Sequence, residues 1–287
     1  MIPHRFEYQA VTSVMEAVGA LSQHRDAKVL AGGHSILPAM KLRLAQPATL
    51  VDIGRIKELV RITPDANGVA IGALTTHTMI AESDDIHQHY PALADAASMI
   101  GDQQVRNRGT IGGSVSHADP AADYPAVLLA LSAEMHAVSV IGARTIRAND
   151  FFVELMTTAL KPNELLVEIR IPSLSPRTGC AYVKFPQPAS RFAIVGACAC
   201  VTLDAQGTCT KAIIGITGAC ATAKRASTTE AALQGKKLDA ATISAATAQA
   251  ANGMDCLSDI HASAEYRAHL VTVMTARAIN AAAARVK

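Results

Sequence analysis

The sequence of 287 residues lacks several features that would assign it to a class of protein at once. Its formal net charge is only +2, so it does not predict the strong positive field of a nucleic-acid-binding protein. It has no uninterrupted apolar run near the roughly 20 residues of a membrane span, and residues 1–7 lack the apolar core of a signal peptide. We therefore expect a soluble cytoplasmic protein with no nucleic-acid partner and no membrane span.

The cysteines are not grouped in a way that favours metal binding. No two of the six form a C-x-x-C pair, and all lie between residues 180 and 256. Zinc and iron–sulfur sites need closer clusters, so we predict that these cysteines are small buried hydrophobic residues. His77, His117 and Asp119 are the other candidate ligands, but their spacing matches no metal site. We therefore predict no metal on this chain.

Several nucleotide-binding and catalytic motifs are also missing. The sequence has no G-x-G-x-x-G that opens a helix, no lysine-containing phosphate loop and no G-x-S-x-G nucleophile elbow. The segment Gly215 to Ala219 follows an apolar strand, but it lacks the spacing of a dinucleotide fingerprint, and we predict a turn there. Since Ser35 has no nucleophile setting, we predict no catalytic residue on the chain.

Two segments with paired glycines stand out from the rest of the chain. Ala31-Gly32-Gly33-His34-Ser35 follows a short apolar run, and Thr110-Ile111-Gly112-Gly113-Ser114 lies about 80 residues further along. Paired glycines permit positive φ and let a ligand approach the backbone, and successive N–H groups at such a turn suit an anion such as phosphate. Each segment alone is equally an ordinary turn, and His34 is either a ligand-facing or structural imidazole or a catalytic base. Together the segments predict one diphosphate held from two sides.

The apolar periodicity predicts two small α/β units before residue 172. In 1–55, a capping box at Ser13 indicates a helix near 12–24. The other elements expected in this unit are a strand before the first glycine segment, a helix at 38–44 and a strand at 50–53. The elements expected in 56–172 are strands at 60–62 and 69–71, helices at 91–100 and 126–131, a hairpin over 135–148 and a strand at 165–171.

A proline-containing linker at 173–179 separates these units from the rest of the chain. The elements expected beyond it are strands at 182–185, 193–203 and 209–216, followed by helices at 227–234, 239–251 and 263–284. Three strands followed by helices are typical of an α+β domain.

Together, the two glycine segments closely resemble the FAD-binding medium subunit of the molybdenum hydroxylase (xanthine dehydrogenase) family, of the carbon monoxide dehydrogenase type. Supporting stretches are Leu50 to Ile53, Ile71 to Thr76, Gln104 to Gly109, and Lys184-Phe185 with Ser190-Arg191-Phe192. The resemblance covers essentially the whole chain. It implies an α+β protein with a bipartite FAD-binding domain of the PCMH type at 1–172, divided into subdomains at about 1–55 and 56–172. A C-terminal α+β domain with a three-stranded sheet and helices would occupy 178–287.

The resemblance also implies that FAD lies extended between the subdomains, with its pyrophosphate over the backbone N–H groups of both glycine segments. The implied contact positions are Leu30, Ala31, Gly32, Gly33, His34, Ser35, Ile36, Leu37, Ile100, Thr110, Ile111, Gly112, Gly113, Ser114, Asp123, Leu166, Lys184 and Phe192.

Some of these side chains have an implied role. Ser35, Thr110 and Ser114 would donate hydroxyl hydrogen bonds, and Leu166 would cover a ring face. Asp123 would accept from hydroxyls of the flavin nucleotide, although Asp119 and Asp123 are equally suited to capping their own loop. Lys184 would place a positive charge beside the cofactor. Phe192 stands where some relatives have a tyrosine, so it offers no hydroxyl.

For function, the resemblance implies an oxidoreductase subunit that works inside a larger complex. The implied partners are a small subunit with [2Fe–2S] clusters and a large molybdopterin subunit, in a dimer of heterotrimers. Electrons would pass from the clusters through FAD to an external acceptor. The alternatives are a free-standing FAD-dependent reductase with its own substrate site and a non-catalytic nucleotide-binding module.

The sequence leaves two properties of such a complex open. The substrate, whether carbon monoxide, an aldehyde, a purine or an N-heteroaromatic ring, would be chosen on another chain, and the sequence does not identify the electron acceptor. The expected location is the cytoplasm, and attachment to the inner face of the membrane through the complex is left open.

Overall fold

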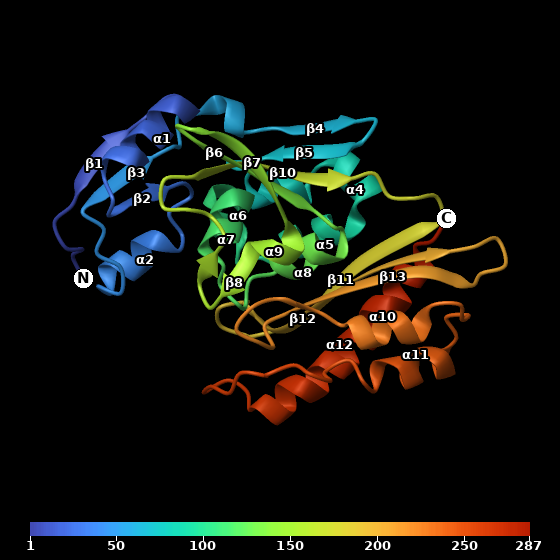
Figure 1. Cartoon of the computed structure of the whole chain (residues 1–287). Coiled ribbons are helices and arrows are strands. Elements are labelled where there is room, and N and C mark those ends of the chain that lie inside the picture. Colours follow the sequence, from blue (N-terminus) through green and yellow to red (C-terminus); the bar gives the residue numbers. More distant parts are fainter.

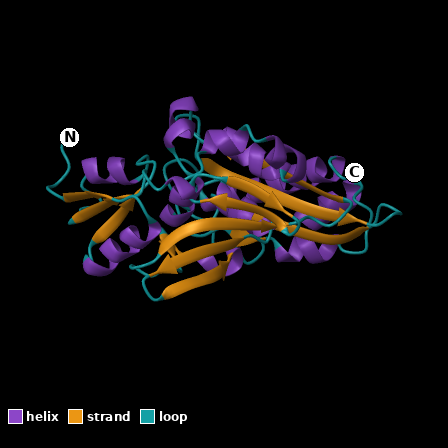
Figure 2. Cartoon of the chain, turned by 90° about the horizontal axis from the view of Figure 1, so that it is seen from above, coloured by secondary structure: helices purple, strands orange, loops and turns teal.

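The computed structural model describes residues 1–287 and arranges them around three main sheets (Figure 1). Three-, five- and four-stranded sheets follow one another along the chain. The N-terminal unit forms one end of an elongated molecule, as the second view also shows (Figure 2). None of the helices is long and apolar enough to cross a membrane.

The N-terminal sheet is parallel and has the order β1-β3-β2. Its elements are β1 (Glu7–Ala10), α1 (Val14–Gln23), β2 (Ala27–Leu30), α2 (Ile36–Lys41) and β3 (Thr49–Asp52). Ser13 caps α1 by accepting a hydrogen bond from the Glu16 N–H at 3.2 Å, as the capping box predicted. α2 begins at Ile36, two residues before its predicted start at 38, with Ser35 at the N-cap. Parallel strands need such helical crossovers.

The central sheet is antiparallel and has the order β4-β5-β10-β6-β7. Its strands are β4 (Ile62–Asp65), β5 (Gly68–Gly72), β6 (Glu134–Ser139), β7 (Gly142–Arg147) and β10 (Leu165–Pro172). The predicted strand at 60–62 is wrong in position. A 3₁₀ turn, η1 (Lys57–Leu59), comes first, and Leu59 turns into the core with 2% of its surface exposed. The apolar residues there therefore serve a buried turn, and the strand begins at Ile62.

Short helices and one small hairpin surround the central sheet. They are α3 (His77–Ala81), α4 (Asp84–His89), α5 (Pro91–Met99), α6 (Gln103–Arg108), α7 (Ile111–His117), α8 (Tyr124–Ala130), α9 (Ala148–Phe151), β8 (Phe152–Glu154) and β9 (Thr157–Thr158). Helices α5 and α8 carry the predicted apolar segments and are largely buried. The second glycine segment is not a loop, since its glycines lie in the first turn of α7.

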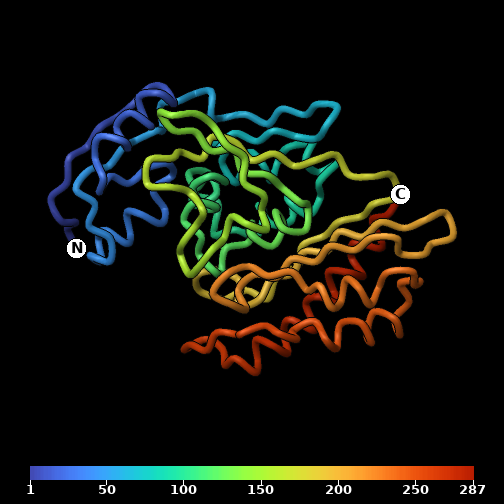
Figure 3. The backbone as a smooth tube through the Cα atoms, in the orientation of Figure 1, coloured from blue at the N-terminus to red at the C-terminus, as the bar shows by residue number.

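The C-terminal sheet has the order β11-β12-β13-β14 and is antiparallel. The three long strands of this sheet correspond to the three predicted strands; they are β11 (Thr178–Pro186), β12 (Ala193–Leu203) and β13 (Cys209–Thr217). A two-residue strand, β14 (Lys224–Arg225), adds an edge to the sheet. The helices are α10 (Ser227–Leu233), α11 (Ala240–Thr247) and α12 (Ala264–Ala284). α12 covers one face of the sheet and brings the end of the chain back beside β11 (Figure 3).

The other face of the C-terminal sheet packs on α5 and α8. An added Cβ at Gly215 would lie 2.0 Å from the Ala126 carbonyl oxygen, so β13 needs glycine there for close packing. Alternate residues of β12 divide between the layers: Cys198 and Cys200 join the core under α5 and α8, whereas Ala197 and Ala199 join the core under α12. Five of the six cysteines are buried, which confirms the prediction for them, and only Cys256 is partly exposed.

Candidate functional site

The first glycine segment forms a turn at the carboxyl end of β2 and leads into α2. Gly33 has a φ of +79°, a conformation that favours glycine, and an added Cβ would approach Leu37 Cδ1 to 2.9 Å. His34 turns back on its own segment, where Nδ1 lies 3.0 Å from the Gly32 carbonyl oxygen. This contact favours the structural role for His34 over the role of a catalytic base.

The backbone N–H groups of this turn are free of protein partners. Gly32, Gly33, His34 and Ser35 donate no backbone hydrogen bond to any protein atom, and the Ser35 hydroxyl makes no capping hydrogen bond to α2. Gly32, Gly33 and Ser35 are partly buried, and backbone donors in such positions are normally paired. Successive free N–H groups at a glycine turn fit an anionic group such as a diphosphate.

The second glycine segment differs, because its backbone N–H groups are already paired. Thr110 caps α7, with its Oγ1 accepting from the Gly113 N–H at 3.1 Å and its carbonyl oxygen accepting from the Ser114 N–H at 3.0 Å. The N–H groups of Ile111 and Gly112 donate to the carbonyl oxygens of Thr75 and Ala73. The N–H groups from Ile111 to Ser114 therefore all have protein partners, and the segment offers a surface without side chains; its contact with the cofactor stays a prediction.

Close packing explains the glycine at 112. An added Cβ there would lie 2.5 Å from Ala73 Cβ and 2.6 Å from the Ala73 carbonyl oxygen. At Gly113, by contrast, an added Cβ would meet only Thr110 Oγ1 at 2.8 Å and Ala31 Cβ at 3.7 Å within 4 Å. Gly112 thus seats α7, while Gly113 faces the first glycine segment.

The two glycine segments lie side by side, as the sequence predicted. An added Cβ at Gly32 would be 2.3 Å from the Arg108 carbonyl oxygen and 2.9 Å from Gly109 Cα. Gly109 directly precedes Thr110, the N-cap of α7. Glycine at 32 therefore lets the N-terminal unit approach the start of the second segment.

A buried histidine that the sequence did not single out as a site residue packs against Gly109, which the first glycine segment also contacts. His77 is 4% exposed, and its Nδ1 lies 3.0 Å from the Tyr124 hydroxyl. An added Cβ at Gly109 would be 2.6 Å from His77 Nε2, so the ring packs directly against the backbone at 109. Burial lowers the pKa of His77 to about 4, with smaller contributions from His34 and Arg106, and the ring is neutral at pH 7.

Asp123 and Lys184, both predicted to contact the cofactor, form a buried ion pair with each other. Lys184 Nζ is 2.8 Å from Asp123 Oδ1, and the two side chains are 3% and 4% exposed. The Tyr182 hydroxyl donates to the same oxygen at 2.6 Å. Burial raises the pKa of the Asp123 carboxyl, and the Lys184 ammonium opposes that change.

Lys184 thus has a buried counter-charge within the protein. Its ammonium group also donates to the carbonyl oxygens of Met99, at 3.0 Å, and Arg191, at 2.7 Å. All of these partners are fixed protein groups, so its charge is largely balanced by Asp123. Asp123 Oδ2 receives no hydrogen bond from the protein and is the oxygen left for a ligand hydroxyl.

The remaining predicted positions divide into two groups. Ile100 follows Met99 at the end of α5, beside Lys184, and Phe192 follows Arg191 on the other side with 42% of its surface exposed. Leu166 lies inside the central core with 3% exposed. Protein atoms already cover the Leu166 side chain, and its predicted role as cover for a ring face stays a prediction.

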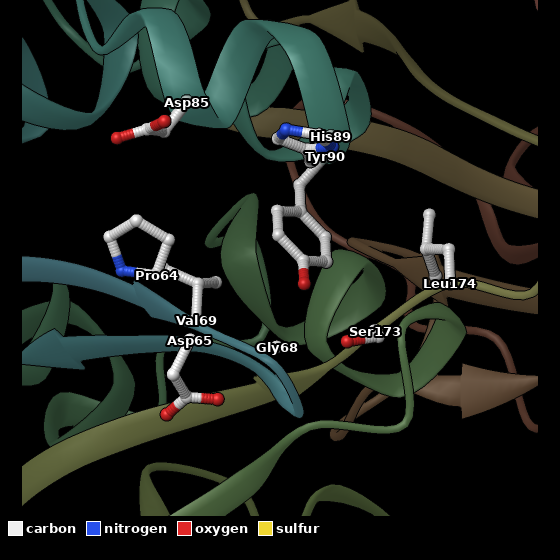
Figure 4. A pocket seen from close by; sticks show the side chains of 9 residues that line it. All are labelled: Pro64, Asp65, Gly68, Val69, Asp85, His89, Tyr90, Ser173 and Leu174. Atoms are coloured by element: carbon white, nitrogen blue, oxygen red, sulfur yellow. The ribbon is translucent and has the colours of Figure 1, made fainter.

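A cavity of about 240 Å³ lies elsewhere, between the β4–β5 hairpin, α4, the start of α5 and the segment after β10 (Figure 4). The Tyr90 hydroxyl on its wall donates to the Pro172 carbonyl oxygen at 3.3 Å. The Asp65 carboxylate is paired with Arg170 at 2.5 Å. None of its lining residues is one of the predicted contact positions, so the two glycine segments remain the candidate site.

The fold and the site define a class of protein: a bipartite domain with a glycine turn of unpaired N–H groups between two units, joined to an α+β domain. Residues 4–174 match the family model described as the FAD binding domain in molybdopterin dehydrogenase. Residues 180–282 match the CO dehydrogenase flavoprotein C-terminal domain. The chain belongs to this family of FAD-binding molybdenum hydroxylase subunits, as the sequence predicted.

The relatives agree over the full length of the chain. The carbon monoxide dehydrogenase medium chain of Hydrogenophaga pseudoflava is 42% identical over 99% of both chains. The 6-hydroxypseudooxynicotine dehydrogenase complex subunit alpha of Paenarthrobacter nicotinovorans is 40% identical over 97% of this chain and 95% of that one. The solved structure of the H. pseudoflava carbon monoxide dehydrogenase superposes with a TM-score of 0.96 over 100% of both chains, which confirms the predicted fold.

Proposed function

We propose that this chain binds FAD across the two glycine segments and serves as the flavin subunit of a molybdenum hydroxylase complex. When bound, FAD supplies the electron-transfer chemistry, taking electrons from a partner's clusters and giving them to an external acceptor. The observation that carries the proposal is the set of free N–H groups at Gly32, Gly33, His34 and Ser35. No catalytic residue and no metal ligand on this chain is needed for this role.

The chain's own groups would bind and orient the cofactor. The free N–H groups of the first segment would donate to the diphosphate, with the Ser35, Thr110 and Ser114 hydroxyls as further donors. Gly113 would leave room for the ligand, because no protein side chain fills the space beside it except Ala31 and Thr110. Asp123 Oδ2 would accept from a hydroxyl of the cofactor.

Lys184 has a positioning role in this proposal. Its ion pair with Asp123 favours the ionised carboxylate, and its hydrogen bonds to Met99 and Arg191 tie that carboxylate to the flanks of the site. Backbone atoms at Ile100 and the exposed face of Phe192 would complete the wall. We assign the FAD-binding domain to 1–172, with subdomains at about 1–55 and 56–172, and the second domain to 178–287. The extents of the two matched family models support this division.

The proposed partners are a small iron–sulfur subunit and a large molybdopterin subunit, in a dimer of heterotrimers in the cytoplasm. Support comes from the relatives, which are named as a medium chain and as a complex subunit. Two relatives of nearly equal identity, 42% and 40%, belong to dehydrogenases of carbon monoxide and of 6-hydroxypseudooxynicotine. Similarity to these relatives therefore does not identify the substrate of the complex.

Purification from the native host tests the proposal. We expect a visible flavin spectrum and two co-purifying chains, one carrying iron and sulfide and the other molybdenum. A colourless protein would instead support a nucleotide-binding module. A flavoprotein that runs alone at 30.0 kDa with full turnover would support the free-standing reductase and overturn the subunit assignment.

A further inference from the structure

Two cysteines outside the flavin site lie directly opposite each other. Cys220 follows β13, Cys256 lies in the segment before α12, and the two residues are partners in an isolated antiparallel bridge. The neighbouring Leu257 N–H donates to the Ala219 carbonyl oxygen at 2.8 Å, which holds the two segments together. Opposite residues in an antiparallel pair have Cβ atoms about 4.5–5.5 Å apart, and a disulfide needs about 3.5–4.5 Å. A small approach of the segments would therefore allow a bond.

The two sulfurs also differ in access to solvent. Cys256 is the only cysteine of the chain that is not buried, whereas Cys220 is 4% exposed. An accessible thiol beside a buried second thiol is the arrangement of an attacking and a resolving cysteine. Disulfides in intracellular proteins are typically transient and redox-sensing.

We propose that Cys220 and Cys256 form a reversible disulfide when the protein meets hydrogen peroxide. The Cys256 thiolate attacks one peroxide oxygen, the O–O bond breaks, and the products are a sulfenic acid and, after protonation, water. The Cys220 sulfur then attacks the sulfenic sulfur, the S–O bond breaks, and the hydroxyl group leaves as a second water. Two thiols lose two electrons and two protons, and one peroxide gains them.

A reduced flavin that passes two electrons and two protons to O₂ releases the same oxidant. The flavin as a source of peroxide rests on the proposed function, whereas formation of the disulfide with peroxide from any source requires only the two cysteines. Peroxide added to the protein tests it separately.

The charged groups around the pair set the pH dependence of the reaction. Burial raises the pKa of Cys256 and Asp255 adds to this effect, whereas the hydrogen bond with Cys220 and the charge of Arg267 lower it in part. Burial raises the pKa of Cys220 to about 12, with Lys224 acting in the opposite direction. Cys256 is thus the thiol that ionises first, and the reaction accelerates as the pH rises above neutrality because the thiolate is the nucleophile.

The bond would fasten a defined part of the C-terminal domain. The chain between the two cysteines contains β14, α10 and α11. The segment before Cys220 contacts the loop that leads to Asp123, because the Gly218 N–H donates to the Pro120 carbonyl oxygen at 2.8 Å. Closing this loop removes conformations from the unfolded chain, so the oxidised protein should melt at a higher temperature than the reduced one.

A matched control exists in the same domain. Cys180 and Cys200 are also directly opposite each other, in β11 and β12, but are 1% and 8% exposed. Their thiols lie in the core beneath α5 and α8, where burial raises the pKa of Cys180 to about 11 and that of Cys200 to about 12. This pair has the same register without the accessible thiol, and we expect it to remain reduced.

The test treats the full-length protein with hydrogen peroxide, blocks free thiols by alkylation and identifies cross-linked peptides by mass spectrometry. We expect free thiols to fall from six to four, a peptide linking Cys220 to Cys256, a melting temperature higher by several degrees, and reversal of all three by dithiothreitol. Cys256→Ser should keep its five remaining thiols. Cys220→Ser should carry a sulfenic acid at Cys256 that an added small thiol converts into a mixed disulfide.

Other outcomes would overturn the proposal. These are six free thiols after treatment, or cross-linking of Cys180 to Cys200 in preference to the proposed pair. The cross-link and the melting temperature of the wild-type protein decide the question even if Cys220→Ser does not fold, because they need no variant.

Discussion

Replacing Lys184 by methionine removes the positive charge from a buried ion pair and leaves the rest of the side chain nearly unchanged. The ammonium is 2.8 Å from Asp123 Oδ1, and both side chains are at most 4% exposed. The variant leaves the Asp123 carboxylate with the Tyr182 hydroxyl but without a counter-charge. Removing one partner of a buried pair destabilises a protein strongly, because the remaining charge is buried and uncompensated.

The size of the loss is limited by protonation of Asp123. Burial already raises the pKa of this carboxyl, and without Lys184 it rises further, so the folded variant takes up a proton. Because the unfolded-state pKa is about 3.9, protonation limits the loss at pH 7 to at most about 4 kcal/mol. Because the folded-state pKa is raised above the unfolded value, the loss grows as the pH rises from about 4 toward the folded-state pKa. It shrinks by about 1.4 kcal/mol for each pH unit as the pH falls toward 4.

Urea unfolding of wild type and Lys184→Met at several pH values between 5 and 8 measures this difference. The control is the double variant Asp123→Asn with Lys184→Met, which keeps the shape of the pair without its charges. Its stability difference from wild type should change less with pH than that of Lys184→Met, because it has no carboxyl at position 123 to take up a proton. Equal stability of Lys184→Met and wild type at pH 7, or a deficit that does not change with pH, would refute the buried-charge reasoning.

Two further predictions concern packing and the buried histidine. In a urea titration, Gly112→Ala should lower the free energy of unfolding by about 1–3 kcal/mol, because its Cβ would lie 2.5 Å from Ala73 Cβ. The control is Gly19→Ala, inside α1, where an added Cβ meets nothing within 4 Å. This control should raise the free energy of unfolding by about 0.5–1 kcal/mol. His77 has a folded pKa of about 4 against an ordinary value of 6.5, so the unfolded chain takes up its proton first and stability should fall by about 3 kcal/mol as the pH drops from 6.5 to 4. Nuclear magnetic resonance titration of the ring checks this, and a His77 pKa near 6.5 in the folded protein would contradict it.

Local sequence signals predicted the elements that depend on local chemistry. The capping box at Ser13 predicted the observed helix start, and the lack of clustering among the cysteines predicted the burial of five of them. The glycine-rich turn at the end of β2 also follows from neighbouring residues alone. These features need no knowledge of distant parts of the chain.

The features that the sequence missed depend on residues far apart in the chain. Gly112 and Gly113 are poor helix formers, but the first turn of α7 is held by distant carbonyl oxygens: Thr75 accepts from the Ile111 N–H and Ala73 accepts from the Gly112 N–H. Likewise, no local spacing joins Asp123 to Lys184, so the same two residues that were predicted as separate cofactor contacts proved to be partners. Tertiary contacts overrode propensity in the first case and neutralised a charge in the second.

The affinity of the purified chain for FAD, measured by flavin fluorescence, tests the central claim that the turn at Gly33 holds the cofactor. Gly33→Val blocks the turn, and Gly207→Val is the matched control, since both glycines have a φ of +79° and Gly207 has nothing within 4 Å. Both variants carry the same backbone strain, but only Gly33 lies beside the free N–H groups. We predict that Gly33→Val weakens FAD binding at least about tenfold, or 1.4 kcal/mol, while Gly207→Val binds like wild type. Wild-type affinity in Gly33→Val, or an equal loss in both variants, would contradict the account.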